Sequence, residues 1–178
     1  AYFSSFSSSW LEHAERYVAT MTERLGLGPG QHVVEVASND GYLLQYVAAR
    51  GIPCTGIEPT ASTAAAARQR GIETVESFFG AELGLKLAAE GRQADLTAAN
   101  NVLAHVPDIN DFLTGFVHLL KPDGVATFAP VPSGTEQDLR DSAVNGQTIL
   151  LFGDSGAVTR STDGGATFPF RAERAQAP

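Results

Sequence analysis

A short apolar segment that ends in a polar turn constrains this fold more than any other stretch of the sequence. Residues 33–37 are apolar apart from one glutamate, and Ser-Asn-Asp-Gly follows at 38–41 before a second apolar run. The next apolar segment, 54–58, ends in Glu58. A strand, a tight turn, a helix and a second strand with a terminal acid form the unit with which a doubly wound α/β sheet holds an adenosine-containing cofactor. The turn offers backbone N–H groups, and the acid accepts hydrogen bonds from ribose hydroxyls.

Apolar and helical patterns alternate along the first three quarters of the chain. Short apolar segments predict strands at 32–37, 54–58, 74–76, 95–100 and 124–128. Apolar residues at helical spacing, closed by glycines or by a Lys-Pro-Asp-Gly turn at 121–124, predict helices at 10–25, 41–50, 61–70, 81–90 and 108–120. This alternation is typical of parallel strands covered by helices on both faces. The predicted fold class is therefore α/β, with a doubly wound, mostly parallel sheet of the Rossmann-like kind.

Size and charge exclude several classes of partner. The chain has 178 residues, of which 43% are hydrophobic and 18% charged, and this is enough for one compact domain with a core. A net charge of −8 argues against a nucleic-acid or anionic-membrane partner, because both need a basic face. Cys54 is the single cysteine, so neither an internal disulfide nor a cysteine zinc cluster is expected, and no metal site is predicted. With no membrane-spanning stretch and no leader pattern, we expect a piece of a longer protein that works in the cytoplasm.

The turn after the first strand distinguishes between cofactor classes. The dinucleotide fingerprint has three glycines here, whereas this turn has only Gly41. A pyrophosphate would have to approach Asn39 closely and would meet the negative charge of Asp40, which disfavours NAD. A ligand with a positive or neutral centre suits the turn better, and S-adenosylmethionine carries a sulfonium and an amino group. The spacing from Glu35 to Glu58 fits both cofactor classes, so an NAD-dependent oxidoreductase fragment is the alternative.

Polar side chains also follow the strand predicted at 95–100. This strand ends in Asn100 and Asn101, and His105 comes shortly after. Ligands sit at the carboxyl ends of parallel strands, so the side-chain carbonyl of Asn100 can accept a hydrogen bond from the amino group of the methionine part. His105 is the one candidate for a catalytic base, and a packed or capping role explains it equally well.

Residues 1 to about 130 resemble the cofactor domain of class I S-adenosylmethionine-dependent methyltransferases. More narrowly, they resemble the C-methyltransferases that act on nucleotide-linked keto-deoxysugars. The stretches that carry the resemblance are Tyr2–Trp10, Glu35–Leu44, Gly56–Pro59, Phe78–Gly80, Asn100–Asp108 and Leu120–Gly124. The first two together are specific for the narrower family, whereas the last three recur in many methyltransferases. The resemblance implies S-adenosylmethionine as cofactor and a nucleotide-linked keto-deoxysugar as small-molecule substrate.

The same resemblance implies where the methionine end of the cofactor lies. Ser38, Asn39 and Gly41 would line this end of the cofactor. Asn100 and Asn101 would lie near its amino group. The turn after the first strand and the end of the fourth strand would thus share one ligand.

The resemblance also implies residues for the adenosine end. Glu58 would bind the ribose, and Pro59 would pack near the adenine. Phe78 or Phe79 would flank the adenine ring. Tyr2 and the serines that follow it would close over the cofactor.

The chain departs from this family at both ends. The family has a cysteine-rich zinc-binding segment before the cofactor domain and a long region after it, which binds the sugar nucleotide and carries the proposed general base. Neither is recognised here, so we predict a truncated methyltransferase domain that binds cofactor with weak or no turnover. The predicted division is a methyltransferase domain at 1–130, a linker at 131–146 and an Asp-box-like hairpin with its tail at 147–178.

The tail carries a pattern of a different kind. The polar segment at 131–146 is predicted as a linker or one short helix near 135–142. Residues 147–152 and 157–161 predict the two strands of a β-hairpin. Ser-Thr-Asp-Gly-Gly-Ala-Thr-Phe at 161–168 resembles the Asp-box of β-propeller repeats, with Phe in the place of Trp. One copy cannot build a propeller, so the alternative of a non-catalytic binding module rests on this tail alone.

Overall fold

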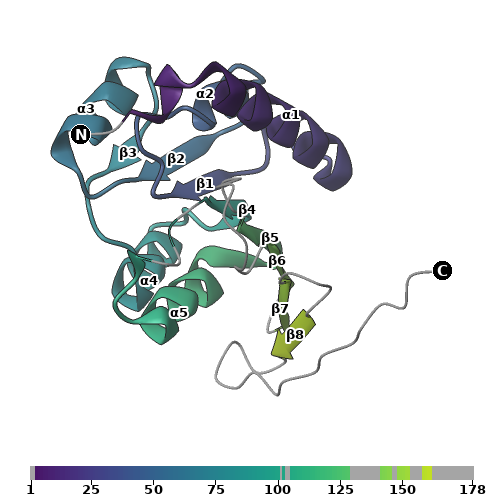
Figure 1. The fold of residues 1–178 in the computed structure, drawn as a ribbon. Helices are drawn as coiled ribbons and strands as arrows, with labels where there is room; N and C mark the ends of the chain where they lie inside the picture. The colour runs from purple at the N-terminus through teal and green to yellow at the C-terminus, as the bar shows by residue number, and fades with distance from the viewer. Residues whose placement is uncertain are drawn as a thin grey trace. The chain divides into compact units, whose positions relative to one another are not determined.

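The structure is a computed structural model that describes residues 3–100, 102, 105–128, 141–145, 148–152 and 158–161 (Figure 1). The chain divides into two compact units, residues 1–79 and residues 80–178. The boundary falls shortly after β3 (Thr74–Val75).

The first unit is a three-stranded parallel sheet with helices between its strands. Its strand order is β3-β2-β1, and the register pairs Val33 with Cys54 and Gly56 with Thr74. Its elements are η1 (Ser4–Phe6), α1 (Ser8–Leu25), β1 (Val33–Val36), α2 (Leu44–Ala48), β2 (Cys54–Ile57), α3 (Ala61–Gln69) and β3 (Thr74–Val75). Helices α1 and α2 pack against each other (Figure 1).

The core of this unit forms where the apolar segments meet. Every residue of β1 is buried, and Leu43, Leu44 and Ile57 are among the largest fully buried side chains. Burying one such side chain stabilises a fold by about 1.5–3 kcal/mol. The helix predicted at 41–50 is shorter than expected, because residues 41–43 form turns and only Leu44–Ala48 is α-helical.

The second unit begins with parallel strands and continues with antiparallel ones. Strands β4 and β5 are parallel, and β5-β6-β7-β8 follow as successive antiparallel pairs. Its elements are α4 (Ala81–Ala89), β4 (Ala94–Ala99), α5 (Ile109–Leu119), β5 (Leu120–Phe128), β6 (Asp141–Asn145), β7 (Thr148–Phe152) and β8 (Val158–Ser161). Helices connect the parallel strands in both units, as in the α/β class, whereas β5 to β8 of the second unit pair in antiparallel fashion.

Two expectations for this unit need correction. The turn predicted at 121–124 lies inside β5, which already starts at Leu120 because Leu120 pairs with Ala94 of β4. Strand β6 lies within the segment that was predicted as a linker or short helix. The predicted hairpin is confirmed, since β7 and β8 are paired and antiparallel. Residues 162–168 of the Asp-box pattern lie outside the described residues.

Aspartates cap both helices of the second unit. The Asp108 carboxylate accepts hydrogen bonds from the backbone N–H groups of Asn110 and Asp111, both at 3.0 Å, at the start of α5. The Asp111 carboxylate accepts one from the N–H of Ala81 at 3.2 Å, at the start of α4. A Cβ on Gly80 would lie 2.0 Å from Asp111 Oδ2, so a larger residue would displace this carboxylate.

Two glycines allow α4 and α5 to approach closely. A Cβ on Gly84 would lie 2.2 Å from the main-chain oxygen of Gly115. No side chain can be inserted at this crossing without moving one helix away from the other. The small residues therefore set the helix separation.

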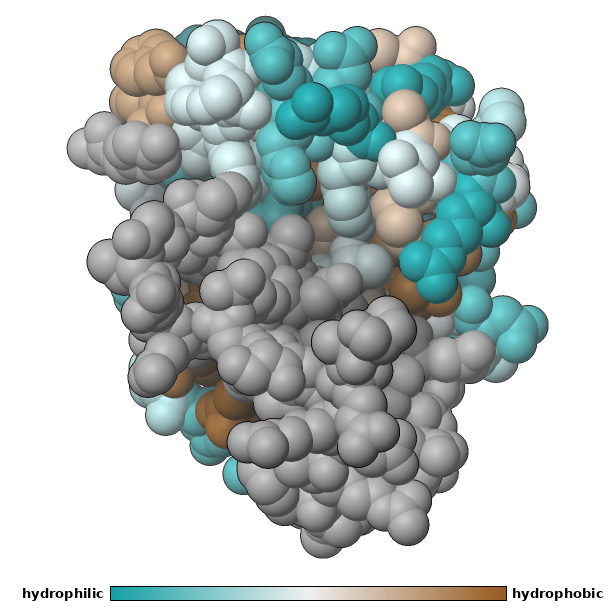
Figure 2. Space-filling view, turned by 45° about the vertical axis from the view of Figure 1, so that its right-hand side comes forward, coloured by the Kyte–Doolittle hydropathy of each residue, from teal (hydrophilic) through white to brown (hydrophobic). Residues whose placement is uncertain are grey.

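The described surface is largely polar. On the face drawn in Figure 2, the coloured surface is mainly hydrophilic, with hydrophobic residues in separate patches. The large apolar side chains that are exposed are Phe6, Phe78, Leu85 and Ile109. Within the described ranges, no helix combines the length and apolar character that crossing a membrane would require.

Candidate cofactor site

The turn between β1 and α2 has an unusual backbone. Ala37 and Asn39 adopt φ values of 58° and 49°, and they are the non-glycine residues with positive φ in the described part of the chain. Gly41 follows with φ of 77°. Positive φ is uncommon for residues with a side chain, and such conformations gather at functional sites. Bonds from outside the turn must therefore hold it in place.

Glu58, directly after β2, provides one of these bonds and also accepts one from its own segment. Its carboxylate accepts hydrogen bonds from the backbone N–H of Asn39 at 3.1 Å and from that of Thr60 at 2.8 Å. The side chain is nearly buried, with Glu58 only 6% exposed. An ionised carboxylate has about four acceptor positions, so capacity is left for ligand hydroxyls. The predicted ribose-binding acid thus also braces the turn after the neighbouring strand.

Asn39 connects the turn to the N-terminal segment. Its side-chain oxygen accepts hydrogen bonds from the backbone N–H groups of Ser4 and Asp40, both at 3.0 Å. The side chain is partly exposed, whereas Ser4 is buried. Asn39 therefore orders its own turn and residues far from it in the sequence.

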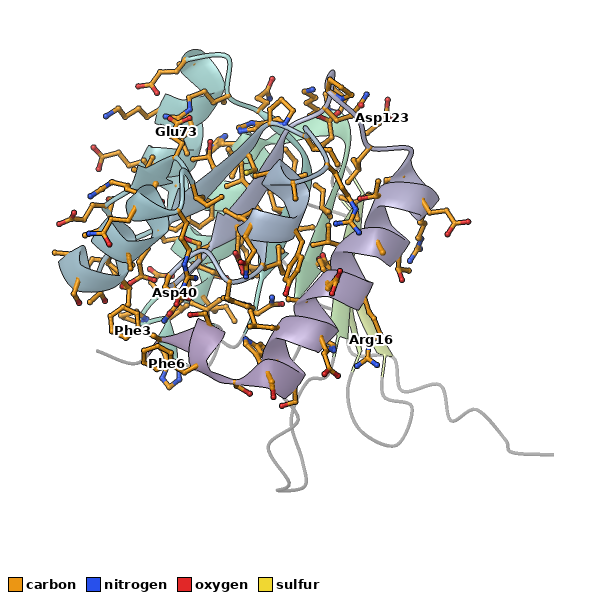
Figure 3. The ribbon with its side chains drawn as sticks, turned by 90° about the horizontal axis from the view of Figure 1, so that it is seen from above. Phe3, Phe6, Arg16, Asp40, Glu73 and Asp123 are labelled. Atoms are coloured by element: carbon orange, nitrogen blue, oxygen red, sulfur yellow. The ribbon has the colours of Figure 1, made fainter. Side chains whose placement is uncertain are left out.

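The surroundings of Asp40 correct the expectation that its negative charge would meet a bound pyrophosphate. The residue is fully buried, and Arg70 Nη1 forms an ion pair with its carboxylate at 3.3 Å. The Ser5 hydroxyl donates to the same carboxylate oxygen. Figure 3 shows Asp40 together with Phe3 and Phe6 at the N-terminal end of the chain. The charge of Asp40 is thus compensated from within the protein and is not presented to a phosphate group.

Glu35 is a candidate that sequence reasoning used only as a spacing marker. It lies near the carboxyl end of β1 and is fully buried, with at least one carboxylate oxygen lacking a hydrogen-bond partner among the described residues. Burial raises the pKa of Glu35 well above its ordinary value, the nearby Tyr42 hydroxyl lowers that pKa, and the carboxylates of Asp40 and Glu58 raise it further. The sequence feature that could have identified Glu35 is a single acidic residue within an apolar strand.

Ser38, in the same turn, is also buried. Its hydroxyl has no hydrogen-bond partner in the described structure. A Cβ on Gly56 of β2 would lie 2.4 Å from Ser38 Oγ, so glycine makes room for this side chain. Glu35, Ser38 and Asp40 each keep an unpartnered buried oxygen at the carboxyl end of β1. Such atoms fit a ligand that brings N–H or O–H donors, as the amino group of S-adenosylmethionine does.

Gly41 joins this turn to α3. A Cβ at this position would lie 3.2 Å from Ile72 Cγ1 and 3.4 Å from Ala67 Cβ. Together with its positive φ, this close approach requires glycine. Ser38, Asn39, Gly41 and Glu58 thus lie around one turn, and their roles toward a cofactor stay predictions.

The predicted adenine contacts lie further along the first unit. Phe78 follows β3 and is 82% exposed, while Phe79 and Pro59 are partly exposed. An exposed aromatic ring is a suitable surface for a heterocyclic base. The roles of these three residues stay predictions.

The remaining predicted residues lie in the second unit or outside the described residues. Asn100 is partly exposed directly after β4, and His105 is exposed, with its backbone N–H bonded to the oxygen of Val102 at 2.9 Å. Tyr2 and Asn101 lie outside the described residues. In the described ranges, no group of three or more His, Cys, Asp or Glu side chains is placed to hold a metal ion.

Comparison with known proteins identifies the family. A family model described as a methyltransferase domain matches residues 34–126, just over half of the chain. The chain therefore belongs to this family of methyltransferase domains. By family it is an S-adenosylmethionine-dependent methyltransferase, and its cofactor is S-adenosylmethionine.

Curated relatives agree with this assignment. The chain is 37% identical over 131 residues to the C-methyltransferase NovU of Streptomyces niveus, a match that covers 74% of this chain and 31% of NovU. It is 30% identical over 111 residues to the ubiquinone biosynthesis O-methyltransferase of Salmonella paratyphi A, covering 61% of this chain and 46% of the relative. The chain thus spans about a third to a half of the length of these relatives.

Solved structures show the same fold. DesVI of Streptomyces venezuelae matches with a TM-score of 0.54 at 14% identity, covering 92% of this chain and 74% of DesVI. The plantazolicin methyltransferase BpumL, solved in complex with a pentazolic analogue and SAH, matches with a TM-score of 0.53 at 10% identity, covering 67% and 46%. At these identities the likeness concerns the fold alone.

Proposed function

We propose that this chain is the cofactor-binding part of a C-methyltransferase that acts on a nucleotide-linked keto-deoxysugar. The observation that carries the proposal is the turn after β1, where Glu58 braces Asn39 and buried oxygens of Glu35, Ser38 and Asp40 lack partners. The relative NovU is a C-methyltransferase, which favours carbon as the methyl acceptor. The resemblance of the serine-rich N-terminal segment to sugar C-methyltransferases supports the acceptor class.

The residues of the first unit have separate tasks in this proposal. Glu58 uses its remaining acceptor capacity for the ribose hydroxyls, and Pro59 with Phe78 or Phe79 packs against the adenine. The turn Ser38–Gly41 faces the methionine end. When bound, S-adenosylmethionine would supply an electrophilic methyl group to the deprotonated carbon next to the sugar ketone, and the methyl–sulfur bond would break to release S-adenosylhomocysteine. We assign no described residue as the base, because His105 is exposed and the site that would place it against a substrate is not defined.

Calorimetric titration of the chain with S-adenosylmethionine, S-adenosylhomocysteine and NAD tests the cofactor part. We expect one-to-one binding of the first two and none of NAD. Glu58→Gln should weaken binding of S-adenosylmethionine by roughly 10- to 100-fold, because hydrogen bonds to a charged group contribute about 1.5–3 kcal/mol. Glu12→Gln, which removes an exposed carboxylate on α1, is the matched control and should bind like the wild type. Equal affinity of the Glu58 and Glu12 variants would refute the ribose assignment.

The acceptor class needs its own test. Because turnover is expected to be weak, the protein is incubated at high concentration with a nucleoside-diphosphate keto-deoxysugar in deuterated water, with and without methyl-labelled S-adenosylmethionine. Deuterium incorporation next to the ketone reports proton removal, and label on that carbon reports transfer. Label on an oxygen atom of the acceptor would instead place the activity with the O-methyltransferase relatives.

A further inference from the structure

The N-terminal segment η1 is attached directly to the candidate cofactor turn. The backbone N–H of Ser4 donates to Asn39 Oδ1 at 3.0 Å, and the Ser5 hydroxyl donates to the Asp40 carboxylate. The two segments are 35 residues apart in the sequence. Tertiary contacts, and not chain connectivity, therefore keep the segment on the turn.

Arg70 contacts both partners at once. Its Nη1 donates to the main-chain oxygen of Asp40 at 2.8 Å and forms the ion pair with the Asp40 carboxylate. Its Nη2 donates to the Ser5 hydroxyl at 2.7 Å. The Ser5 hydroxyl thus accepts from Arg70 and donates to Asp40. One planar guanidinium makes all these bonds, which a lysine ammonium cannot reproduce with the same geometry.

The backbone places Arg70 at this point. Arg70 is the C-cap residue of α3, and Gly71 follows with φ of 79° and ends the helix. The close approach of Gly41 to Ala67 and Ile72 brings the last turn of α3 against the cofactor turn. The position of the guanidinium is therefore set by main-chain packing on both sides.

The ion pair between Arg70 and Asp40 is important because Asp40 is buried. Its carboxylate is fully buried, while the Arg70 side chain is 35% exposed. Removing the cation would leave a buried negative charge without its ion partner, directly beside Asn39. The backbone of Asn39 is already in the left-handed region, so the turn depends on its bonds for its shape.

We propose that Arg70 is a positioning residue that couples docking of the segment Ser4–Phe6 to binding of the cofactor at the turn after β1. The inference rests on the proposed function, in that this turn holds the cofactor. Arg70 acts through Ser5 and Asp40 on the geometry of the turn. Because such coupling is reciprocal, bound cofactor must stabilise the docked segment by the same factor by which the segment raises cofactor affinity.

The experiment compares the wild type with Arg70→Ala, Arg70→Lys and the control Arg50→Ala. Arg50 is exposed, and in the described structure its guanidinium donates to the Tyr46 main-chain oxygen at its own helix end, so the control matches the charge change. The first readout is the affinity for S-adenosylhomocysteine by calorimetry. The second is hydrogen–deuterium exchange of the amides at residues 4–7, with and without this ligand. Circular dichroism confirms that each variant is folded.

We expect Arg70→Ala to weaken S-adenosylhomocysteine binding about tenfold and to speed exchange at residues 4–7, with ligand no longer slowing that exchange. Arg70→Lys should recover part of both effects, and Arg50→Ala should change neither. Loss of affinity without faster exchange, or faster exchange with unchanged affinity, would overturn the coupling. If the wild type binds no ligand, the proposed function fails by itself. The ligand-free exchange of Arg70→Ala then decides separately whether Arg70 holds the segment, and unchanged exchange would overturn that as well.

Discussion

Acidic side chains serve different purposes in the two units. In the second unit, Asp108 and Asp111 each accept backbone N–H groups at a helix start, so their oxygens satisfy groups of the fold itself. In the first unit, Glu35 and Asp40 are fully buried and each retains at least one oxygen without a partner. Native structures seldom leave such atoms unsatisfied without a reason. The difference teaches that acids at the helix starts satisfy the fold itself, whereas Glu35 and Asp40 keep acceptor capacity that the described residues do not use.

The largest expected effect concerns the helix pair of the second unit. Gly84→Ala would place a Cβ 2.2 Å from the main-chain oxygen of Gly115, and forcing α4 and α5 apart should cost about 3 kcal/mol of unfolding free energy. Chemical denaturation measures this loss. Gly28→Ala is the control, because the nearest atom to its Cβ would be 3.6 Å away and its stability should change by less than about 0.5 kcal/mol. Equal stability of the two variants would mean that the helices do not meet at Gly84.

A smaller effect is expected beneath the cofactor turn. Gly56→Ala would bring a Cβ to 2.4 Å from Ser38 Oγ, and should destabilise the protein by about 1–2 kcal/mol and weaken S-adenosylmethionine binding several-fold. The double variant Ser38→Ala with Gly56→Ala removes the clashing hydroxyl and should recover part of both losses. Calorimetry and denaturation of the single and double variants provide the comparison. If the double variant is no better than Gly56→Ala, the clash is not with the Ser38 hydroxyl.

The smallest effect is a pH dependence that belongs to Glu35. Burial raises the pKa of Glu35 in the folded protein above its ordinary value of 4.5. Above pH 4.5, the unfolded chain therefore binds fewer protons than the native protein. Because of Glu35, the wild type therefore loses stability as the pH rises from the pKa of this carboxyl in the unfolded chain toward its higher pKa in the folded protein. Glu35→Gln, which resembles the protonated acid, should become more stable relative to the wild type as pH rises.

Urea denaturation of both proteins at pH 5 and pH 8 checks this prediction. The advantage of Glu35→Gln should be larger at pH 8. The control variant Glu12→Gln changes an exposed acid and should show the same offset at both pH values. A constant offset for Glu35→Gln as well would contradict the raised pKa.

The sequence predicted the elements better than the contacts between them. Strands and the turn around Gly41 follow from apolar periodicity and glycine positions, which are local properties. Strand β5 starts at Leu120 despite the Lys-Pro-Asp-Gly pattern, because pairing with β4 overrides the local turn preference. Arg70 closes an alanine-rich helix and carries no local signal of its role. Its function depends on Ser5 and Asp40, which only the tertiary structure brings to it.

The short link between η1 and α1 has a kinetic consequence. Ser7 is at once the residue that ends η1 and the N-cap of α1, since its hydroxyl accepts from the N–H of Trp10. A released segment therefore remains tethered next to the turn, at an effective concentration in the millimolar range or above. Closing so short a loop takes on the order of 10–100 ns, far less than the millisecond or longer of a typical turnover. Reclosing of a released segment is therefore not expected to limit the rate at which cofactor is exchanged.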